Sequence, residues 1–423
     1  MNIQTPPKPT PAEQALIDGY GERFSRLAGN PDVVQARDLA FDRFRQSGLP
    51  TRRVEAWHYT DLRRLLSDVP AYNQEAMAEP VGELLEHSAI AIAANGQALQ
   101  ADDNIDGVTW RPLTELLADG SLASSLAPRD ADDMIGALNA SFVSGGWALD
   151  IEAGAEIDVP LEIQNVHGGG QVHTRFPVTV GAGAKAVIVE RQTGQGAAFV
   201  TSLADVTLDE DATVDWIVLQ EQPDTVSYLS SFSATLGRNA RLRLFVMNAG
   251  GRLVREEVVV AVQGEGADFQ LRTVNLLAGE GHTDLTMVLD HTVPSTTSTE
   301  VVRNVVTGKA KGVFQGRINV HQVAQKTDAR MACNTLLMSD DADFSAKPEL
   351  EIFADDVACG HGATVAEINH DHLFYLMARG ISEKEARRLL VKAFVAEVIE
   401  ELDDEALVEA LEARLDGWFA DNG

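Results

Sequence analysis

The middle of the chain carries a repeat with a nearly constant period, and this repeat strongly constrains the fold. An apolar residue is followed four positions later by a small one, and a β-like run begins directly after it. The register continues loosely at Ala267, moves by half a period at Gly281, and continues at Ala310 and Ala342. Periods of roughly 20 to 50 residues are typical of solenoids and arrays. The small residues of the first four repeats are 29, 28 and 28 positions apart: Ala155, Ala184, Ala212 and Ala240.

Each repeat has the pattern of a strand, a tight turn and a second strand, as in residues 207–220 and 235–248. No helical pattern separates the repeats, which excludes βαβ architecture. A solenoid stacks one coil per repeat and buries a continuous core that no single coil could bury alone. An antiparallel sandwich is the structural alternative, because short strands bounded by turns also describe that fold. The near-constant period favours the solenoid, so we predict a mainly β chain with a β-solenoid core over residues 147–368.

Helical patterns precede this core. Residues 11–27 and 31–45 carry apolar residues at helical spacing, and a proline near the start of each fits a helix N-terminus. Residues 48–66 follow, where a Gly/Pro break leads into Trp57, His58 and Tyr59. We expect His58 to be packed among these aromatic rings. We predict a cap domain of helices and short strands over residues 1–146.

Helical patterns also follow the core, and they predict a helical domain over residues 369–423. Residues 371–379 end at Gly380, which suits the position just after a helix. Ser382 and Glu385 predict a capping box for the next helix, and Asp403 or Asp404 precedes a last amphipathic helix. These helices either cover the end of their own solenoid or dock a partner.

The composition excludes several classes of protein. Of 423 residues, 45% are hydrophobic, which is enough for a large core. No run of residues approaches the roughly 18 apolar residues of a membrane span. A formal charge of -30 would repel a nucleic-acid backbone. The N-terminus lacks a basic segment followed by an apolar one, and the two cysteines lack a CxxC spacing. We therefore expect a cytoplasmic protein.

Enzyme signatures are absent from the sequence. Residues 181–186, GAGAKA, match a dinucleotide-binding pattern, but a strand-like run follows them where that pattern needs a helix N-terminus. The sequence contains no phosphate-binding P-loop, no GxSxG nucleophile turn and no HExxH zinc motif. We therefore expect a chain that catalyses nothing on its own.

A cysteine and a histidine two residues apart are the candidates for metal chemistry. In DDVACGHGAT, residues 355–364, a strand would direct Cys359 and His361 to one face, and a thiolate and an imidazole both suit iron or zinc. Two ligands do not complete a site, and the next histidines, His370 and His372, belong to the following helical segment. The alternative is that Cys359 is simply a small buried apolar residue.

Three motifs occur in order near the C-terminus: KPELEI, then DDVACGHGAT, then LFYLMARGI with a helix after it. Together they make residues 321–394 resemble the C-terminal core of the SufB/SufD family of iron–sulfur cluster assembly proteins. EAWHYTDL, residues 55–62, resembles an element of the SufD branch, with His58 where arginine is usual. The chain length and the low number of cysteines also favour that branch.

The resemblance implies a right-handed parallel β-helix between helical terminal domains, acting as a scaffold subunit of the SUF complex. It implies a SufB-type partner joined through the solenoid, a homodimer when the chain is alone, and a SufC-type ATPase docked on the C-terminal helices. It also implies that His361 and Cys359 contribute to binding iron or a nascent iron–sulfur cluster shared with the SufB-type partner. A flavin is associated with the family's complex, but this sequence has no fingerprint for one. The docking residues that we predict are Phe374, Tyr375, Arg379, Gly380, Leu390 and Phe394.

Two alternatives belong to other functional classes. A β-helix carbohydrate-active enzyme would need carboxylates clustered on one solenoid face, aromatic platforms for sugars and usually an export signal. Aromatic residues make up only 6% of this chain, which counts against it. A purely architectural solenoid would be distinguished by the absence of iron from its purified complex.

Overall fold

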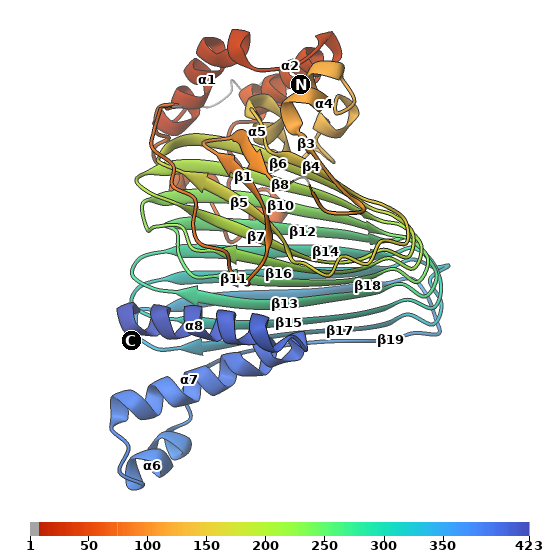
Figure 1. The fold of residues 1–423 in the computed structure, drawn as a ribbon. Helices are drawn as coiled ribbons and strands as arrows, with labels where there is room; N and C mark the ends of the chain where they lie inside the picture. Colours follow the sequence, from red (N-terminus) through yellow and green to blue (C-terminus); the bar gives the residue numbers. More distant parts are fainter. Residues whose placement is uncertain (1–7, 74, 103, 423) are drawn as a thin grey trace, which may run out of the picture.

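Two long sheets form the centre of the protein in the computed structural model, which describes residues 8–73, 75–102 and 104–422 (Figure 1). Sheet A has ten strands in the order β19-β17-β15-β13-β11-β9-β7-β5-β1-β2. Its strands are β1 (Ala89–Ala94), β2 (Gln97–Ala101), β5 (Leu161–His167), β7 (Lys185–Gly194), β9 (Thr213–Gln220), β11 (Arg241–Asn248), β13 (Asp268–Leu277), β15 (Thr297–Val306), β17 (Asp328–Leu337) and β19 (Ala358–Glu367).

Sheet B has nine strands in the order β18-β16-β14-β12-β10-β8-β6-β4-β3. Consecutive strands from β4 to β19 therefore alternate between the two sheets, and neighbours within a sheet run parallel, as β8 and β10 do. This arrangement is a β-solenoid of about eight turns, so the prediction is confirmed and the antiparallel sandwich is wrong. The strands of sheet B are β3 (Val108–Pro112), β4 (Trp147–Ile151), β6 (Gly170–Val180), β8 (Ala198–Leu208), β10 (Val226–Leu236), β12 (Leu253–Val262), β14 (His282–His291), β16 (Lys311–Val320) and β18 (Asp343–Ile352).

The repeated alanines occupy one corner of successive coils, as the period predicts. Ala184, Ala212 and Ala240 are fully buried between a sheet B strand and the next sheet A strand. The backbone N–H of Thr213 donates to the carbonyl of Ala184, and that of Arg241 donates to the carbonyl of Ala212, so the corners stack directly. Only a small side chain fits there.

The residue before each corner alanine has a left-handed backbone, with φ of 71° at Gly183, 59° at Asp211 and 54° at Asn239. Glycine, aspartate and asparagine tolerate this conformation best, which explains the residue types at this position of the repeat. Gly281, Ala310 and Ala342 lie at the opposite corner, between a sheet A strand and the next sheet B strand. That switch of corner is the physical origin of the half-period shift in the sequence.

A ladder of amides crosses the apolar interior. Asn248 Nδ2 donates to Asn275 Oδ1 (2.9 Å), and Asn275 Nδ2 donates to Asn304 Oδ1 (2.8 Å). Asn304 Nδ2 then donates to Thr335 Oγ1 (3.1 Å). Each residue pairs in register with the next across β11, β13, β15 and β17. The stack therefore satisfies buried polar groups from one coil to the next.

The N-terminal helices cover the outer face of sheet B. Helix α5 contacts β6, β8 and β10, and it packs with α1 and α2 on Phe199, Leu203 and Leu229. Strands β1, β2 and β3 from the same part of the chain extend the two sheets. The predicted helices over 11–27 and 31–45 are confirmed, although the first ends earlier. The helices of this part are α1 (Pro11–Arg23), α2 (Pro31–Ser47), α3 (Leu62–Leu65), α4 (Leu113–Asp119) and α5 (Met134–Phe142), with 3₁₀ turns at Phe24–Arg26, Glu55–Trp57 and Ser124–Leu126.

The C-terminal helices are α6 (His370–Ala378), α7 (Glu383–Ile399) and α8 (Glu405–Asn422), with a 3₁₀ turn at Glu400–Leu402. Val391, Val395 and Val398 of α7 join a cluster with Phe245 and Val274 on the outer face of sheet A. Helices α6 and α7 extend past the last coil (Figure 1). The C-terminal helices therefore cover the outer face of sheet A and leave the end of the solenoid uncovered. Among the described residues, no helix is long and apolar enough to cross a membrane.

The capping predictions for these helices are partly confirmed. Ser382 Oγ accepts from the Glu385 N–H (3.3 Å), but no reciprocal bond completes a capping box between these two residues. The Glu385 carboxylate instead lies 3.5 Å from Arg388 Nε. Asp404 caps α8, since its Oδ1 accepts from the Leu407 N–H (3.0 Å).

Candidate functional site

The strand that carries DDVACGHGAT is the last strand of sheet A. β19 pairs with β17 on one side, and no strand in the described part of the chain pairs with its other side. The Ala358 N–H donates to the Thr327 carbonyl (2.9 Å), so the even-numbered residues of β19 bond to β17. The odd-numbered residues then direct their N–H and C=O groups toward the free edge. β18 is likewise the last strand of sheet B, and we call β18 and β19 together the open end.

Cys359 and His361 lie on the inner face of β19, as their two-residue spacing predicts. They pair with Ala329 and Met331 of β17, which belong to the solenoid core. Ala329 is 0% and Met331 2% exposed, whereas Cys359 is half-buried and His361 is exposed. The difference arises because no further coil covers the open end. Partial burial raises the pKa of the Cys359 thiol, so the thiol keeps its proton at neutral pH.

The open end supplies a thiol and an imidazole but not a full ligand set. No group of three His, Cys, Asp or Glu side chains among the described residues could hold a metal ion. His370 and His372 are exposed on α6, beyond the end of β19. Iron at Cys359 and His361 would therefore need further ligands from outside this chain.

A line of contacts joins β19 to α7. Asn334 Nδ2 on β17 donates to Thr364 Oγ1 on β19 (2.7 Å), and Arg303 on β15 donates to Asn334. Arg303 also pairs with Glu397 (3.0 Å) and lies over the ring of Phe394, 5.2 Å from its centroid. The strand with the candidate ligands, β19, is thus connected to helix α7 through β17 and β15.

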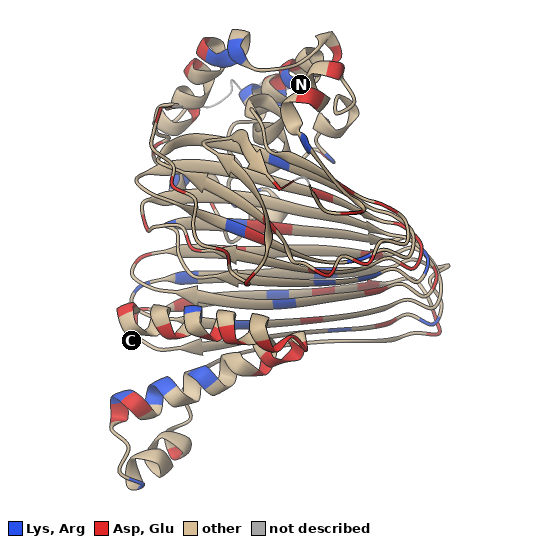
Figure 2. Cartoon of the chain, viewed as in Figure 1, with Lys and Arg blue, Asp and Glu red and all other residues tan. Residues whose placement is uncertain are grey.

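The residues predicted to dock a partner divide into two sets. Phe374 is 73% and Tyr375 57% exposed on α6, and Arg379 and Gly380 are exposed at its end. Leu390 and Phe394 are instead partly buried against the protein's own apolar cluster. On α7 it is the neighbouring Leu389, 41% exposed, that faces solvent, and the sequence reasoning missed it. Basic residues recur along α7 (Figure 2): Lys384, Arg387, Arg388 and Lys392.

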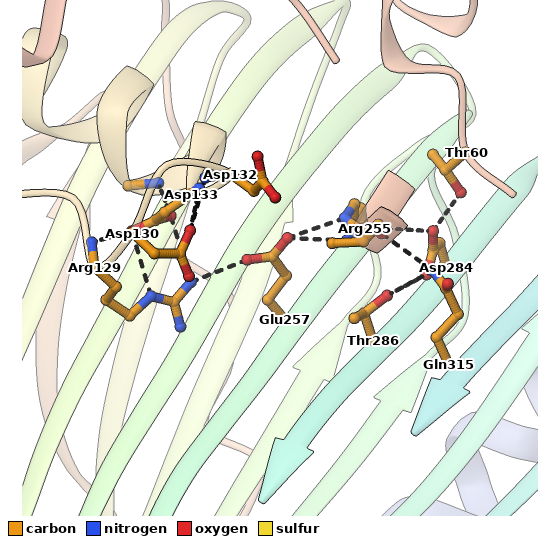
Figure 3. A network of polar contacts seen from close by, with 12 residues as sticks. Thr60, Arg129, Asp130, Asp132, Asp133, Arg255, Glu257, Asp284, Thr286 and Gln315 are labelled. Carbon is orange, nitrogen blue, oxygen red and sulfur yellow. Dashed lines mark hydrogen bonds and ion pairs between the residues drawn. The ribbon is translucent and has the colours of Figure 1, made fainter. Parts of the chain in front are cut away.

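The EAWHYTDL element is held on the outer face of sheet B. Trp57 and Thr60 are fully buried, and Thr60 Oγ1 donates to the carboxylate of Asp284. The guanidinium of Arg255 lies 3.8 Å from the centroid of the Trp57 ring. The same guanidinium pairs with Asp284 (Figure 3). His58 is exposed and packs only edge-on against Tyr59 (4.8 Å between ring centroids), so the expectation that it is packed among the aromatic rings is confirmed for Tyr59 alone, since the chain turns Trp57 inward.

This network continues across the sheet and was not predicted from the sequence. Arg255 also pairs with Glu257 (3.0 Å), which in turn pairs with Arg129 (3.0 Å) before α5 (Figure 3). Glu55 pairs with Lys347 of the KPELEI motif. The two motif regions, nearly 300 residues apart in sequence, are therefore in direct contact. Arg255 and Glu257 share β12, but their partners come from segments far away in the sequence, so no local sequence pattern could reveal the network.

Comparison with known proteins agrees with this geometry. The model of the SufBD core domain, described as belonging to SUF system FeS cluster assembly, matches residues 163–394, from β5 into α7. The model of the SufBD protein N-terminal region matches residues 11–82, which include the EAWHYTDL element at residues 55–62. The core match alone spans more than half of the chain. The chain belongs to the SufBD family.

Similar proteins align with most of the chain. A SufBD family protein of Synechocystis is 27% identical over 92% of this chain and 90% of its own length. The iron–sulfur cluster assembly protein SufD of Escherichia coli is 26% identical, over 88% of this chain and 89% of its own. The chloroplastic protein ABCI7 of Arabidopsis thaliana is 26% identical over 87% and 82%. Membership of the SufBD family places this chain in the SUF system for iron–sulfur cluster assembly.

Proposed function

We propose that this chain is a non-catalytic scaffold subunit of the SUF complex, and that it pairs through its open end with a SufB-type sister subunit. The open end has two edge strands of ten residues each, with unpaired backbone groups and an inner face that is half-buried on β18 and mostly exposed on β19. Long uncovered edge strands are aggregation sites in a protein that works alone. Strand pairing with a second solenoid would satisfy both the backbone and the inner face.

Iron, or a nascent iron–sulfur cluster, is the cargo at this junction. Cys359 and His361 supply two ligands from the inner face, and the partner subunit supplies the rest. Thiolate and imidazole are both ligands of iron in proteins. An incomplete ligand set at a free edge is what a shared site requires, since neither chain should hold the cargo permanently.

The test compares two substitutions in the complex co-expressed with SufB-type and SufC-type chains. His361→Ala removes one imidazole and keeps the flanking glycines, so the strand should fold and pair while iron and sulfide per complex fall by more than half. Cys359→Ser should also lower iron, with little change in melting temperature. Normal iron loading in both variants would leave a purely architectural subunit, and a large loss of stability in Cys359→Ser would make that thiol a core residue.

The SufC-type ATPase docks on α6 in this proposal, because Phe374 and Tyr375 are apolar side chains left exposed next to helices that carry basic residues. Deleting everything after Gly380 is a poor test, since α7 and α8 cover the apolar outer face of sheet A. The double substitution Phe374→Ser with Tyr375→Ser should abolish capture of the ATPase without changing the melting temperature. Leu99→Ser is the matched control, because Leu99 is also an exposed apolar residue but lies on β2, at the other end of sheet A. Full capture by the double variant would place the docking surface elsewhere.

A further inference from the structure

Glu300 on β15 is a buried carboxyl group that no ion pair neutralises among the described residues. The residue is 0% exposed, and neither carboxyl oxygen has a hydrogen-bond partner of normal geometry there. The Ser298 side chain and the Arg272 guanidinium are close enough to lower the pKa of Glu300, but burial outweighs both, and the Ser298 hydroxyl lies 3.3 Å from His291 Nε2. Buried acids in native proteins are nearly always hydrogen-bonded or paired, so an orphaned one calls for an explanation.

The position of Glu300 relates it to the open end. Glu300 pairs in register with Met331 of β17, and Met331 pairs with His361 of β19. All three lie on the inner face, one strand apart, in a single column. One strand deeper the same column holds Leu271, an apolar residue that the interior accommodates without cost. Glu300 is thus an acid between an apolar residue, Leu271, and a thioether, Met331, in a column that ends at a candidate iron ligand.

Few charged groups lie near Glu300 to balance a carboxylate. Burial raises its pKa to about 8, so the carboxyl is largely neutral at pH 7. The Met331 side chain crosses the interior toward β16 and brings no charge to Glu300: a Cβ added at Gly316 would lie 2.4 Å from the Met331 sulfur. The titratable and charged groups around Glu300 on the neighbouring elements are Asp268 and Arg272 of β13, His291 of β14 and Cys359 of β19.

We propose that Glu300 is a positioning residue for the iron cargo: its carboxyl is neutral while the open end is empty and becomes a carboxylate, releasing its proton to water, when ferrous iron binds at Cys359 and His361. The inference rests on the proposed function of that site. The carboxylate does not touch the iron, because Met331 lies between them. It supplies a negative charge inside the solenoid that favours a cation at its end.

The size of the effect follows from distance and charge. Two strand spacings separate the column positions of Glu300 and His361, which is about 10 Å. Ferrous iron bound by the Cys359 thiolate and by neutral ligands from the partner has a net charge near +1, and at an effective dielectric constant of about 20 its attraction strengthens binding about tenfold when Glu300 is ionised. When Glu300 is protonated, the gain disappears. The dependence on pH therefore distinguishes this role from a structural one.

The experiment measures ferrous iron affinity under anaerobic conditions, by competition with a chromophoric chelator, in the assembled complex from pH 6 to pH 8.5. Glu300→Gln keeps the shape and cannot ionise. Wild type and Glu300→Gln should bind equally at pH 6, and wild type should bind about tenfold more tightly at pH 8.5. Glu256→Gln is the matched control, because Glu256 on β12 is also buried, with its pKa raised to about 7, but lies farther from the open end. It should change the affinity less than about threefold.

Other outcomes separate the two proposals. If wild type binds ferrous iron, His361→Ala does not, and Glu300→Gln shows no pH-dependent difference, then the site stands and the role of Glu300 is wrong. If wild type binds no iron, the proposed site and this inference both fail. Should Glu300→Gln fold poorly, Glu300→Leu repeats the test with the residue type of Leu271, and a wild-type pH profile in that variant would equally overturn the role.

Discussion

The two ends of the solenoid differ in how their edge strands are built. At the N-terminal end, sheet A finishes in β2 and sheet B in β3, and each has five residues and pairs antiparallel with its neighbour. β3 ends at Pro112 and leads directly into α4. At the C-terminal end, β18 and β19 have ten residues each and run parallel to the stack. Only the N-terminal end has the short edge strands by which proteins prevent unwanted pairing.

This contrast teaches where the molecule can accept another chain. Short antiparallel strands and a proline leave little backbone for a partner at the first coil. The last coil keeps a full-length parallel edge, and the C-terminal helices pack beside it without covering it. An end that evolution could have closed with a strand or helix is left open, which agrees with the proposed pairing through β19.

The largest expected effect tests whether the open end is really uncovered. Cys333 on β17 and Ala363 on β19 are in-register neighbours on the inner face, but Cys333 is 1% exposed and Ala363 is exposed. Cys333→Asp buries an uncompensated carboxylate and should lower the free energy of unfolding by about 4 kcal/mol. Ala363→Asp should change it by less than about 0.5 kcal/mol. Urea unfolding of the isolated chain, at concentrations where it is a monomer, gives both values, and equal losses would mean that the last coil is as closed as the one before it.

A smaller effect is expected from breaking the free edge alone. Ala363 directs its N–H toward the free edge, whereas Thr364 directs its N–H toward β17. Ala363→Pro should therefore keep the fold but weaken association with the SufB-type subunit about 100-fold, since the new ring and the missing donor block strand pairing. Thr364→Pro removes a bond within the chain and should lower the melting temperature as well. Undiminished association of the Ala363→Pro variant would show that the partner does not extend this sheet.

The fold was largely predictable because its corners impose residue types at fixed intervals. A left-handed residue followed by a buried alanine recurs at positions such as Asp211 and Ala212, and this pattern is visible in the sequence. The stacking of Arg255 on Trp57 was not predictable, because this contact joins segments almost 200 residues apart in sequence. Likewise β1 carries no trace of the repeat although it pairs in register with β5.

The candidate site was predictable only in part. The two-residue spacing places Cys359 and His361 on one face of a strand, and the predicted end of the solenoid at residue 368 makes that strand the last. The spacing does not say whether the face is inside the solenoid, because this depends on the pairing of Cys359 and His361 with Ala329 and Met331. On α7 the sequence predicts Leu390 as a docking residue, but the structure buries Leu390 partly and exposes its neighbour Leu389.

The smallest expected effect compares one exposed apolar side chain at each end. Val365 of β19 is 44% exposed at the open end, and Leu99 of β2 is 63% exposed at the closed end. Neither substitution to serine should change the free energy of unfolding by more than about 0.5 kcal/mol, since both side chains already contact water. If a partner covers only the open end, Val365→Ser should weaken its binding about tenfold, as expected for the loss of one buried valine. Leu99→Ser should change binding less than about twofold. Titration of the labelled SufB-type subunit against both variants measures this ratio, and equal losses at the two ends would mean that the edge geometry does not select the binding end.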